Sequence, residues 1–187
     1  KFLGYFTSNK SKLTPQQMFL KLIYTKEQEK KSELLNTLPS TFSNVFVDTN
    51  GAAYSTCMGI GNDLLKKHST NGTNMLGNVK TSSALTDVTA NKDGIIYASD
   101  SHGMIWVYTS QGEVIFQLGA EAADKDISGL FTSLTTIAVD NSGNIWTADG
   151  EKGYLQSFTP TEYATTIFKA LKEYENGDYK EALTDWN

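Results

Sequence analysis

Arginine is absent from this 187-residue chain, so all 16 of its Lys/Arg cations are lysines. Asp and Glu together number 21, which leaves a net charge of −5 and a pI near 5.0. Arginine is the usual bidentate partner of phosphate and guanine. Because the chain is acidic and lacks arginine, it has no dominant basic surface, and we expect no nucleic-acid partner.

Cysteine and long apolar runs are also scarce. Cys57 is the single cysteine, which excludes an intrachain disulfide and a cysteine-based zinc site. No apolar run approaches the roughly 18 residues of a membrane helix, and no signal peptide is visible, so we expect no membrane segment within this chain. The chain starts at Lys1 rather than at methionine, and we expect it to be a piece of a longer protein.

What the chain does contain is a repeated hairpin pattern, and its clearest copy is LTTIAVDNSGNIWTAD at residues 134–149. Ile137 and Val139 fall on one face of an alternating strand. Gly143 closes an Asp-Asn-Ser-Gly turn and can adopt the positive φ that a short hairpin loop needs. Trp146 lies on the second strand and offers a large ring for packing. One hairpin cannot bury its own apolar face, so its copies elsewhere in the chain matter.

Two earlier copies of this pattern align on their turn glycines. Gly51, Gly94 and Gly143 correspond, with spacings of 43 residues (94 − 51) and 49 residues (143 − 94). A period of about 40–50 residues built from short strands is typical of propeller blades. The same alignment matches an Asp or Asn, an aliphatic residue and an aromatic residue in every copy: Asp48, Asn91 and Asp140; Val45, Val88 and Ile137; Tyr54, Tyr97 and Trp146.

Each copy is followed by two further strand-like stretches. In the second copy these are residues 105–108 and 114–118. Four strands per repeat form the blade of a β-propeller. The sequence therefore predicts a mainly β fold, with three four-stranded propeller-type blades at 41–79, 82–122 and 131–169.

Helical patterns flank the predicted blades. Thr14 and Pro15 mark a helix start within an N-terminal linker or helix region, residues 1–40. After the blades, apolar side chains recur at helical spacing up to Gly177, which is suited to end a helix. A second helix follows, so the sequence predicts a C-terminal helical hairpin at 164–187.

Two parts of the chain resemble known repeat families. The phrases GIIYASDSHGMIWVYTSQGEVIFQLG and IAVDNSGNIWTADG resemble blades of NHL-repeat propellers, and the resemblance covers about residues 40–169. The string YENGDYKEALTDW resembles the middle of a tetratricopeptide repeat, with Ala182 as the small residue at the helix contact and Trp186 as the large aromatic. A chain that joins these two modules resembles a group of bacterial, membrane-linked proteins in which the propeller lies outside the membrane. The resemblance therefore implies an extracellular or cell-surface location within such a parent protein.

The predicted repeats are incomplete as units. Three blades do not close a ring, because propellers have about 4–8 blades. A single truncated helical repeat likewise cannot bury its faces. Two hypotheses follow: the parent protein continues with more blades or helical repeats, or two chains associate with each other to complete a six-bladed ring.

The candidate catalytic or ligand-binding residues lie mostly at turns. Asp48, Asn91 and Asp140 stand at the same turn in every copy, where Asp or Asn hydrogen-bonds its own backbone, so we assign them a structural role. Asp100 and Asp149 end the second strand of their blades. The resemblance places such an aspartate at a loop entrance, where it braces the loop or contacts a ligand.

His102 and Trp106 follow Asp100 along the chain. The adjacency of Asp100, Ser101 and His102 does not supply the mutual reach that a Ser-His-Asp nucleophile set needs. The ring of Trp106 could stack on a sugar or pack between blades. We predict no catalytic residue and no metal site, we expect no cofactor while leaving calcium open, and we name four ligand-binding candidates: Asp100, His102, Trp106 and Asp149.

The function predicted from these observations is a non-catalytic binding or protein-interaction module, with a protein or a carbohydrate as its ligand. Two alternatives stay open, because propellers host several functions. One is a metal-dependent lactonase-like or lyase-like propeller enzyme. The other is a structural spacer domain.

Overall fold

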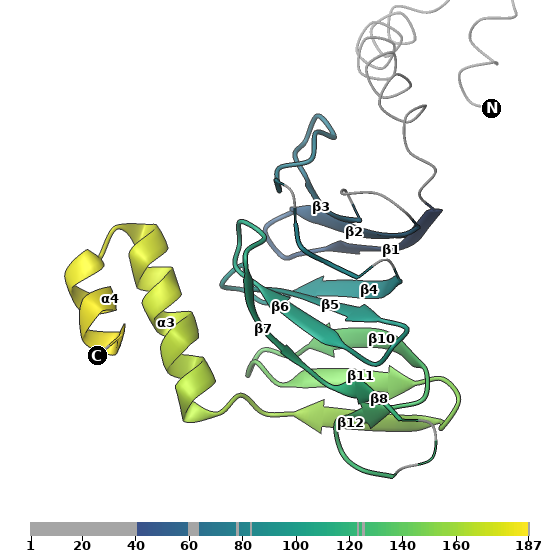
Figure 1. Cartoon of the computed structure of the whole chain (residues 1–187). Helices are drawn as coiled ribbons and strands as arrows, with labels where there is room; N and C mark the ends of the chain where they lie inside the picture. Colours follow the sequence, from purple (N-terminus) through teal and green to yellow (C-terminus); the bar gives the residue numbers. More distant parts are fainter. Residues whose placement is uncertain are drawn as a thin grey trace, which may run out of the picture. The chain divides into compact units, whose positions relative to one another are not determined.

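The computed structural model of the chain describes residues 41–59, 64–77, 79–82, 84–122, 124 and 126–186 (Figure 1). The predicted N-terminal linker and helix, residues 1–40, lie outside the described residues. Across the described ranges the fold is mainly β, with twelve strands in four sheets followed by two helices. The prediction of a mainly β fold with a C-terminal helical pair is confirmed.

Three antiparallel sheets make up most of the fold. The first sheet has the order β1-β2-β3, with bounds Thr41–Val47, Ala53–Met58 and Leu65–His68. The middle sheet has the order β4-β5-β6-β7, with bounds Leu85–Ala90, Ile96–Asp100, Ile105–Tyr108 and Val114–Leu118. The third sheet has the order β10-β11-β12, with bounds Leu134–Val139, Ile145–Asp149 and Tyr154–Phe158. A short parallel pair, β8 (Ala120–Glu121) with β9 (Leu130–Phe131), lies in the connection between the middle and third sheets.

Where the structure describes the chain, only the middle sheet has the four strands that the repeat predicts, so three four-stranded blades are not confirmed. In the first sheet, the place of a fourth strand is taken by an isolated bridge between His68 and Asn74. In the third sheet, Pro160 follows β12 closely, and the side chain of Thr161 accepts a hydrogen bond from the N–H of Ala164. This cap starts a helix, so the chain does not return as a strand.

The three hairpin turns adopt one conformation. Gly51, Gly94 and Gly143 each have a φ of +83°, a region that is costly for residues with a Cβ. In the first of these turns, the N–H of Gly51 donates to the carbonyl of Asp48 at 3.0 Å. The same bond closes the other two turns, at 3.1 and 3.0 Å. The turn chemistry predicted for Gly143 is therefore confirmed.

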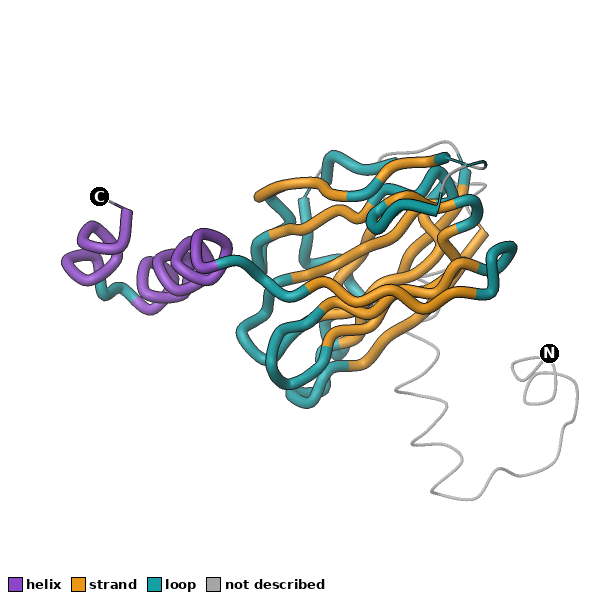
Figure 2. Tube along the Cα trace, turned by 90° about the horizontal axis from the view of Figure 1, so that it is seen from below, coloured by secondary structure: helices purple, strands orange, loops and turns teal. Residues whose placement is uncertain are grey.

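The sheets stack in chain order, with the middle sheet packed on both faces (Figures 1 and 2). One hydrophobic cluster joins the first and middle sheets, and a second joins the middle and third sheets. The largest fully buried side chains of the first cluster are Tyr54, Leu65, Leu85, Ile96 and Tyr108. Those of the second cluster are Tyr97, Ile105, Phe131 and Leu134.

Two helices follow β12 and lie beyond one end of the strands (Figures 1 and 2). The first, α3, spans Glu162–Asn176, and the second, α4, spans Tyr179–Trp186. Gly177 separates them with a φ of +87°, and its N–H bonds to carbonyls of the last turn of α3. Ala170 and Ala182 are each the buried residue of their helix, which lets the two helices approach closely.

Candidate functional site

The hairpin turns alternate between two ends of the sheets, because successive strands are antiparallel. We call the end with the β1–β2, β4–β5 and β10–β11 turns the turn end; these turns contain Gly51, Gly94 and Gly143. The β5–β6 turn, with Gly103, and the β11–β12 turn, with Gly153, lie at the opposite end. Two sets of candidate residues are therefore separated by the length of the strands.

The turn end is built from one repeated side-chain motif. The Oδ1 atoms of Asp48, Asn91 and Asp140 each accept two backbone hydrogen bonds, at 2.8 to 3.0 Å. The donors stand two and four residues after the acceptor: Asn50 and Ala52, Asp93 and Ile95, Ser142 and Asn144. The three residues act as turn acceptors, as predicted.

An aromatic residue six positions later completes this motif. The hydroxyl of Tyr54 donates to Asp48 Oδ2 at 3.4 Å, and Nε1 of Trp146 donates to Asp140 Oδ2 at 3.2 Å. Hydrogen bonds from the Asn144 side chain and from Trp146 lower the pKa of Asp140 from 3.8 to about 2. Burial, followed by the charge of Asp48, raises the pKa of Tyr54 to about 12.

A cavity of about 610 Å³ lies between these three turns and α3. Phe46, Tyr97 and Phe168 contribute rings, and Asn91, Asn141 and Ser142 contribute amide and hydroxyl groups. Three lysines also line it: Lys92, Lys169 and Lys172. Ligand pockets of this size usually combine apolar walls with a few polar groups that orient the ligand. This cavity has both.

Helix α3 is fixed to the middle sheet by contacts around the cavity. Lys172 Nζ forms an ion pair with Asp93 on the β4–β5 turn. Ser110 on the β6–β7 turn donates to Glu175 Oε1 at 2.7 Å. The rings of Phe168 and Phe116 stack with centroids 5.8 Å apart. These contacts make α3 one wall of the cavity.

Helix α4 forms an ion pair with Lys169, one of the lysines that line the cavity. Lys169 Nζ lies 2.8 Å from an oxygen of Asp185 on α4, and 3.5 Å from Glu173 on its own helix. The hydrogen bond and charge of Asp185 raise the pKa of Lys169, and the hydrogen bond from Lys169 lowers the pKa of Asp185. The ammonium group is therefore cationic at neutral pH, with part of its charge balanced by α4.

Three of the four predicted ligand-binding residues belong to the β5–β6 hairpin: Asp100 ends β5, His102 lies in the turn at the opposite end, and Trp106 lies on β6. Asp100 is 3% exposed, and its Oδ1 accepts from the N–H groups of His102 and Met104 at 2.9 and 3.1 Å. Its Oδ2 accepts from Trp106 Nε1 at 3.0 Å. The His102 side chain is exposed. This turn repeats the motif of the turn end.

Asp149 lies in the third sheet and holds two segments together. Its carboxylate accepts from the N–H groups of Thr132, Ser133, Glu151 and Lys152, at 2.7 to 3.3 Å. Burial alone would raise the pKa of Asp149, but these N–H groups outweigh burial and lower it. None of Asp100, His102, Trp106 and Asp149 lines the large cavity, and their role in ligand binding stays a prediction.

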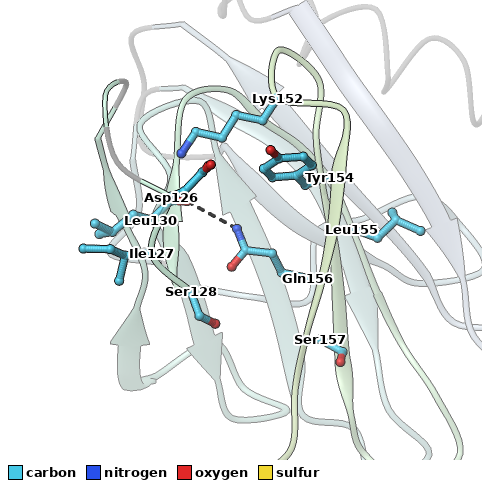
Figure 3. A pocket seen from close by; sticks show the side chains of 9 residues that line it. All are labelled: Asp126, Ile127, Ser128, Leu130, Lys152, Tyr154, Leu155, Gln156 and Ser157. Atoms are coloured by element: carbon cyan, nitrogen blue, oxygen red, sulfur yellow. Dashed lines mark hydrogen bonds between the residues drawn. The ribbon is translucent and has the colours of Figure 1, made fainter.

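A smaller pocket of about 320 Å³ lies beside β12 (Figure 3). The side chains of Asp126 and Lys152 point toward one another, and Tyr154 lies next to Lys152 (Figure 3). Gln156 fixes the far wall by accepting from the N–H of Gly129 at 2.8 Å. It also donates from Nε2 to the carbonyl of Leu130 at 3.3 Å.

Hydrogen bonds between polar side chains join β1, β4 and β10, the first strands of the three sheets, which we call the inner strands. We call this set of residues the polar ladder, and the sequence interpretation missed it. Asn44 Nδ2 donates to Asp87 Oδ1, and Ile137 N–H donates to Asp87 Oδ2 at 2.9 Å. The Thr136 hydroxyl also donates to Asp87 Oδ2. Asn44, Asp87 and Thr136 each stand seven residues before their turn glycine, at a register shift of the strand. The repeat alignment contains this signal, as a polar residue that recurs in an apolar strand.

In the part of the chain that the structure describes, no group of three or more His, Cys, Asp or Glu side chains is placed to hold a metal ion. No helix of residues 41–186, the undescribed gaps aside, has the length and apolarity to cross a membrane.

No protein-family model and no curated protein matches the chain. Solved structures of β-propeller proteins are similar to it at low identity. Streptogramin B lyase is 14% identical over 68% of this chain and 44% of the lyase, with a TM-score of 0.47. The computationally designed Ika4 protein is 13% identical over 64% of this chain and 66% of Ika4, also with a TM-score of 0.47.

A third similar structure is the extracellular domain of a hybrid two-component system from B. thetaiotaomicron. It is 11% identical over 64% of this chain and 17% of that domain, with a TM-score of 0.43. The chain thus spans between 17% and 66% of the length of these three proteins.

Proposed function

We propose that this chain is a non-catalytic binding module, formed by part of an NHL-type β-propeller and the start of a tetratricopeptide-like helical pair. The observation that carries the proposal is the cavity of about 610 Å³ between the three repeated turns and α3. Its walls come from β1–β2, β4–β5, β10–β11 and α3, so the ligand would bind both modules at once. Its rings and amides suit a peptide or a carbohydrate.

The carboxylates favour binding over catalysis. Asp100 and Asp149 are buried, and N–H groups of nearby backbone donate to their carboxylates, as they do to the half-buried turn acceptors Asp48 and Asp140. A general acid or a metal ligand needs oxygen atoms directed at a substrate or an ion. These oxygens instead accept hydrogen bonds from the chain's own backbone N–H groups and from nearby aromatic side chains.

Location is part of the same proposal. The resemblance to NHL and tetratricopeptide proteins favours an extracellular or cell-surface position within a bacterial, membrane-linked parent. Cleavage of the native protein by protease added to intact cells would support this position. Protection of the protein until the cells are lysed would contradict it.

Filling the cavity tests the binding site. Asn141 is exposed on the β10–β11 turn and lines the cavity, so Asn141→Trp places a large ring inside it. We expect peptides or glycans selected on display libraries or arrays to bind this variant at least about tenfold more weakly, a change of about 1.4 kcal/mol.

The matched control is His102→Trp, an exposed turn position at the opposite end. We expect this variant to bind the same ligands as the unmodified chain. Loss of binding in His102→Trp alone would move the site to the predicted residues Asp100, His102 and Trp106. If libraries of both ligand classes yield no binder, the chain is a structural spacer.

A metal titration tests the enzyme alternative. Calcium and other divalent ions should leave the melting temperature unchanged. A rise of about 5 °C that a chelator reverses would correspond to roughly 2 kcal/mol for a domain of this size. That result would favour the hypothesis that the chain is a metal-dependent lactonase-like or lyase-like enzyme.

A further inference from the structure

Three equivalent aromatic residues show that one sheet face is not covered by any described part of the chain. Tyr54, Tyr97 and Trp146 each stand three residues after their turn glycine, at the same place in their sheets. Tyr54 and Tyr97 are each 1% exposed, because the next sheet in the stack covers them. Trp146 is 44% exposed. Its ring occupies an inter-sheet position with no following sheet among the described residues.

The neighbouring strand repeats this difference. Leu65 pairs with Thr56 in the first sheet, Ile105 with Ser99 in the middle sheet, and Leu155 with Ala148 in the third sheet. Leu65 and Ile105 are 1% and 0% exposed, whereas Leu155 is 74% exposed. We call the face of the third sheet that contains Trp146, Ala148 and Leu155 the leading face.

The opposite end of the stack shows the complementary pattern. Val45, Val88 and Ile137 are equivalent, and in the middle and third sheets this position packs against the preceding sheet. Val88 and Ile137 are 2% and 4% exposed, but Val45 in the first sheet is 65% exposed. Val47, next to it on the same side of β1, is exposed as well. We call this face, with Val45 and Val47, the trailing face.

The two faces match the interfaces that the chain already forms. Within the chain, the leading side of one sheet packs on the trailing side of the next, first to middle and middle to third. The ladder Asn44–Asp87–Thr136 joins the same three sheets at their inner strands. Its terminal members are Asn44 on β1 of the first sheet and Thr136 on β10 of the third sheet. The same interface would continue at these two strands.

We propose that a second copy of this chain occupies both faces. The leading face of each copy packs on the trailing face of the other, and two copies form a closed ring of six sheets. Each contact joins two different faces, and a twofold axis relates the two contacts, so that the leading face of each copy meets the trailing face of the other. Six sheets lie within the range of about 4–8 blades that propellers adopt. The leading-face residues Trp146, Ala148 and Leu155 do not line the cavity beside α3, whereas Val47 of the trailing face does.

Sedimentation equilibrium and light scattering on the purified chain test the pairing. We expect a mass twice the 20.6 kDa of one chain. Trp146→Asp removes the leading face and Val45→Asp removes the trailing face, and each should weaken the dimer by at least about a hundredfold, or about 2.7 kcal/mol. Tyr163→Asp, at an exposed aromatic on α3, is the matched control and should leave the dimer unchanged. Circular dichroism confirms that the variants fold.

Mixing the two damaged variants separates this arrangement from one in which each face packs on the same face of the other copy. A leading-face variant and a trailing-face variant retain one intact contact between them, so the mixture should recover a dimer that neither variant forms alone. No recovery on mixing, a monomeric unmodified chain, or an assembly larger than two copies would each overturn the two-copy ring. Ligand binding by monomeric Trp146→Asp would leave the proposed function intact.

Discussion

The middle and third sheets share one repeat, but among the described residues only the middle sheet is packed on both faces. Tyr97 and Trp146 illustrate the difference: they are equivalent in sequence, yet one is enclosed and the other is largely accessible. The repeat therefore determines which side chains can form an inter-sheet contact. The neighbouring sheet determines whether the contact contributes to stability. Three predictions test this comparison.

The largest effect is expected from removing the ring at each equivalent position. Tyr97→Ala should lower the free energy of unfolding by about 4 kcal/mol, because it leaves a cavity in the core. Trp146→Ala should cost about 1 kcal/mol in the single chain, since its ring is only partly buried. Urea denaturation, at a dilution where the chain is monomeric, measures both. Equal losses would show that the leading face is covered within one chain.

A smaller effect is expected from the aspartates that end β5 and β11. Asp149→Ala removes the acceptor of four backbone N–H groups and should cost about 3 kcal/mol, whereas Asp100→Ala should cost about 2 kcal/mol. Asp124→Ala, at an exposed position, is the control and should change stability by less than about 0.5 kcal/mol. A stable Asp149→Ala variant that loses ligand binding would instead make Asp149 a ligand contact.

The smallest effect concerns pH, at the turn where the two sheets differ. The middle sheet has Asn91 where the third sheet has Asp140. The pKa of Asp140 is lowered from 3.8 to about 2, so its carboxylate stabilises the folded state above about pH 4, and this contribution disappears as the pH falls toward 2. Asp140→Asn should therefore be less stable than the unmodified chain near neutral pH and nearly equal to it at pH 2.

Urea titrations at both pH values measure this difference. The reciprocal variant Asn91→Asp should acquire a new loss of stability over the same range, because it creates the carboxylate turn in the middle sheet. A gap between Asp140→Asn and the unmodified chain that stays constant with pH would show that Asp140 acts as a neutral acceptor.

Much of this fold could be predicted because the repeat is local. Gly143 and its two equivalents specify the turns, and alternating residues such as Ile137 specify the buried side of each strand. The number of strands was harder to predict, since Pro160 and Thr161 direct the chain into α3 immediately after β12. A strand and a helix compete there within a few residues. The cap decides between them, and a repeat alignment does not represent it.

The candidate site could be predicted less well than the fold. Asp100 and His102 are adjacent in sequence, so sequence analysis groups them readily. The large cavity instead joins turns that lie 43 and 49 residues apart with a helix that follows all of them. Its residues share no local pattern. Only the polar ladder of Asn44, Asp87 and Thr136 could have been recognised from the alignment alone.

The attachment of α3 has a mechanical consequence. The helix follows β12 in the chain, but its side-chain anchors, Lys172 to Asp93 and Glu175 to Ser110, are on the middle sheet. A force that pulls on the C-terminus would thus reach the middle sheet through these side-chain anchors. It would also reach β12, at the edge of the third sheet, through the backbone. While the anchors hold, tension would be shared between two paths, and the third sheet would be shielded from peeling.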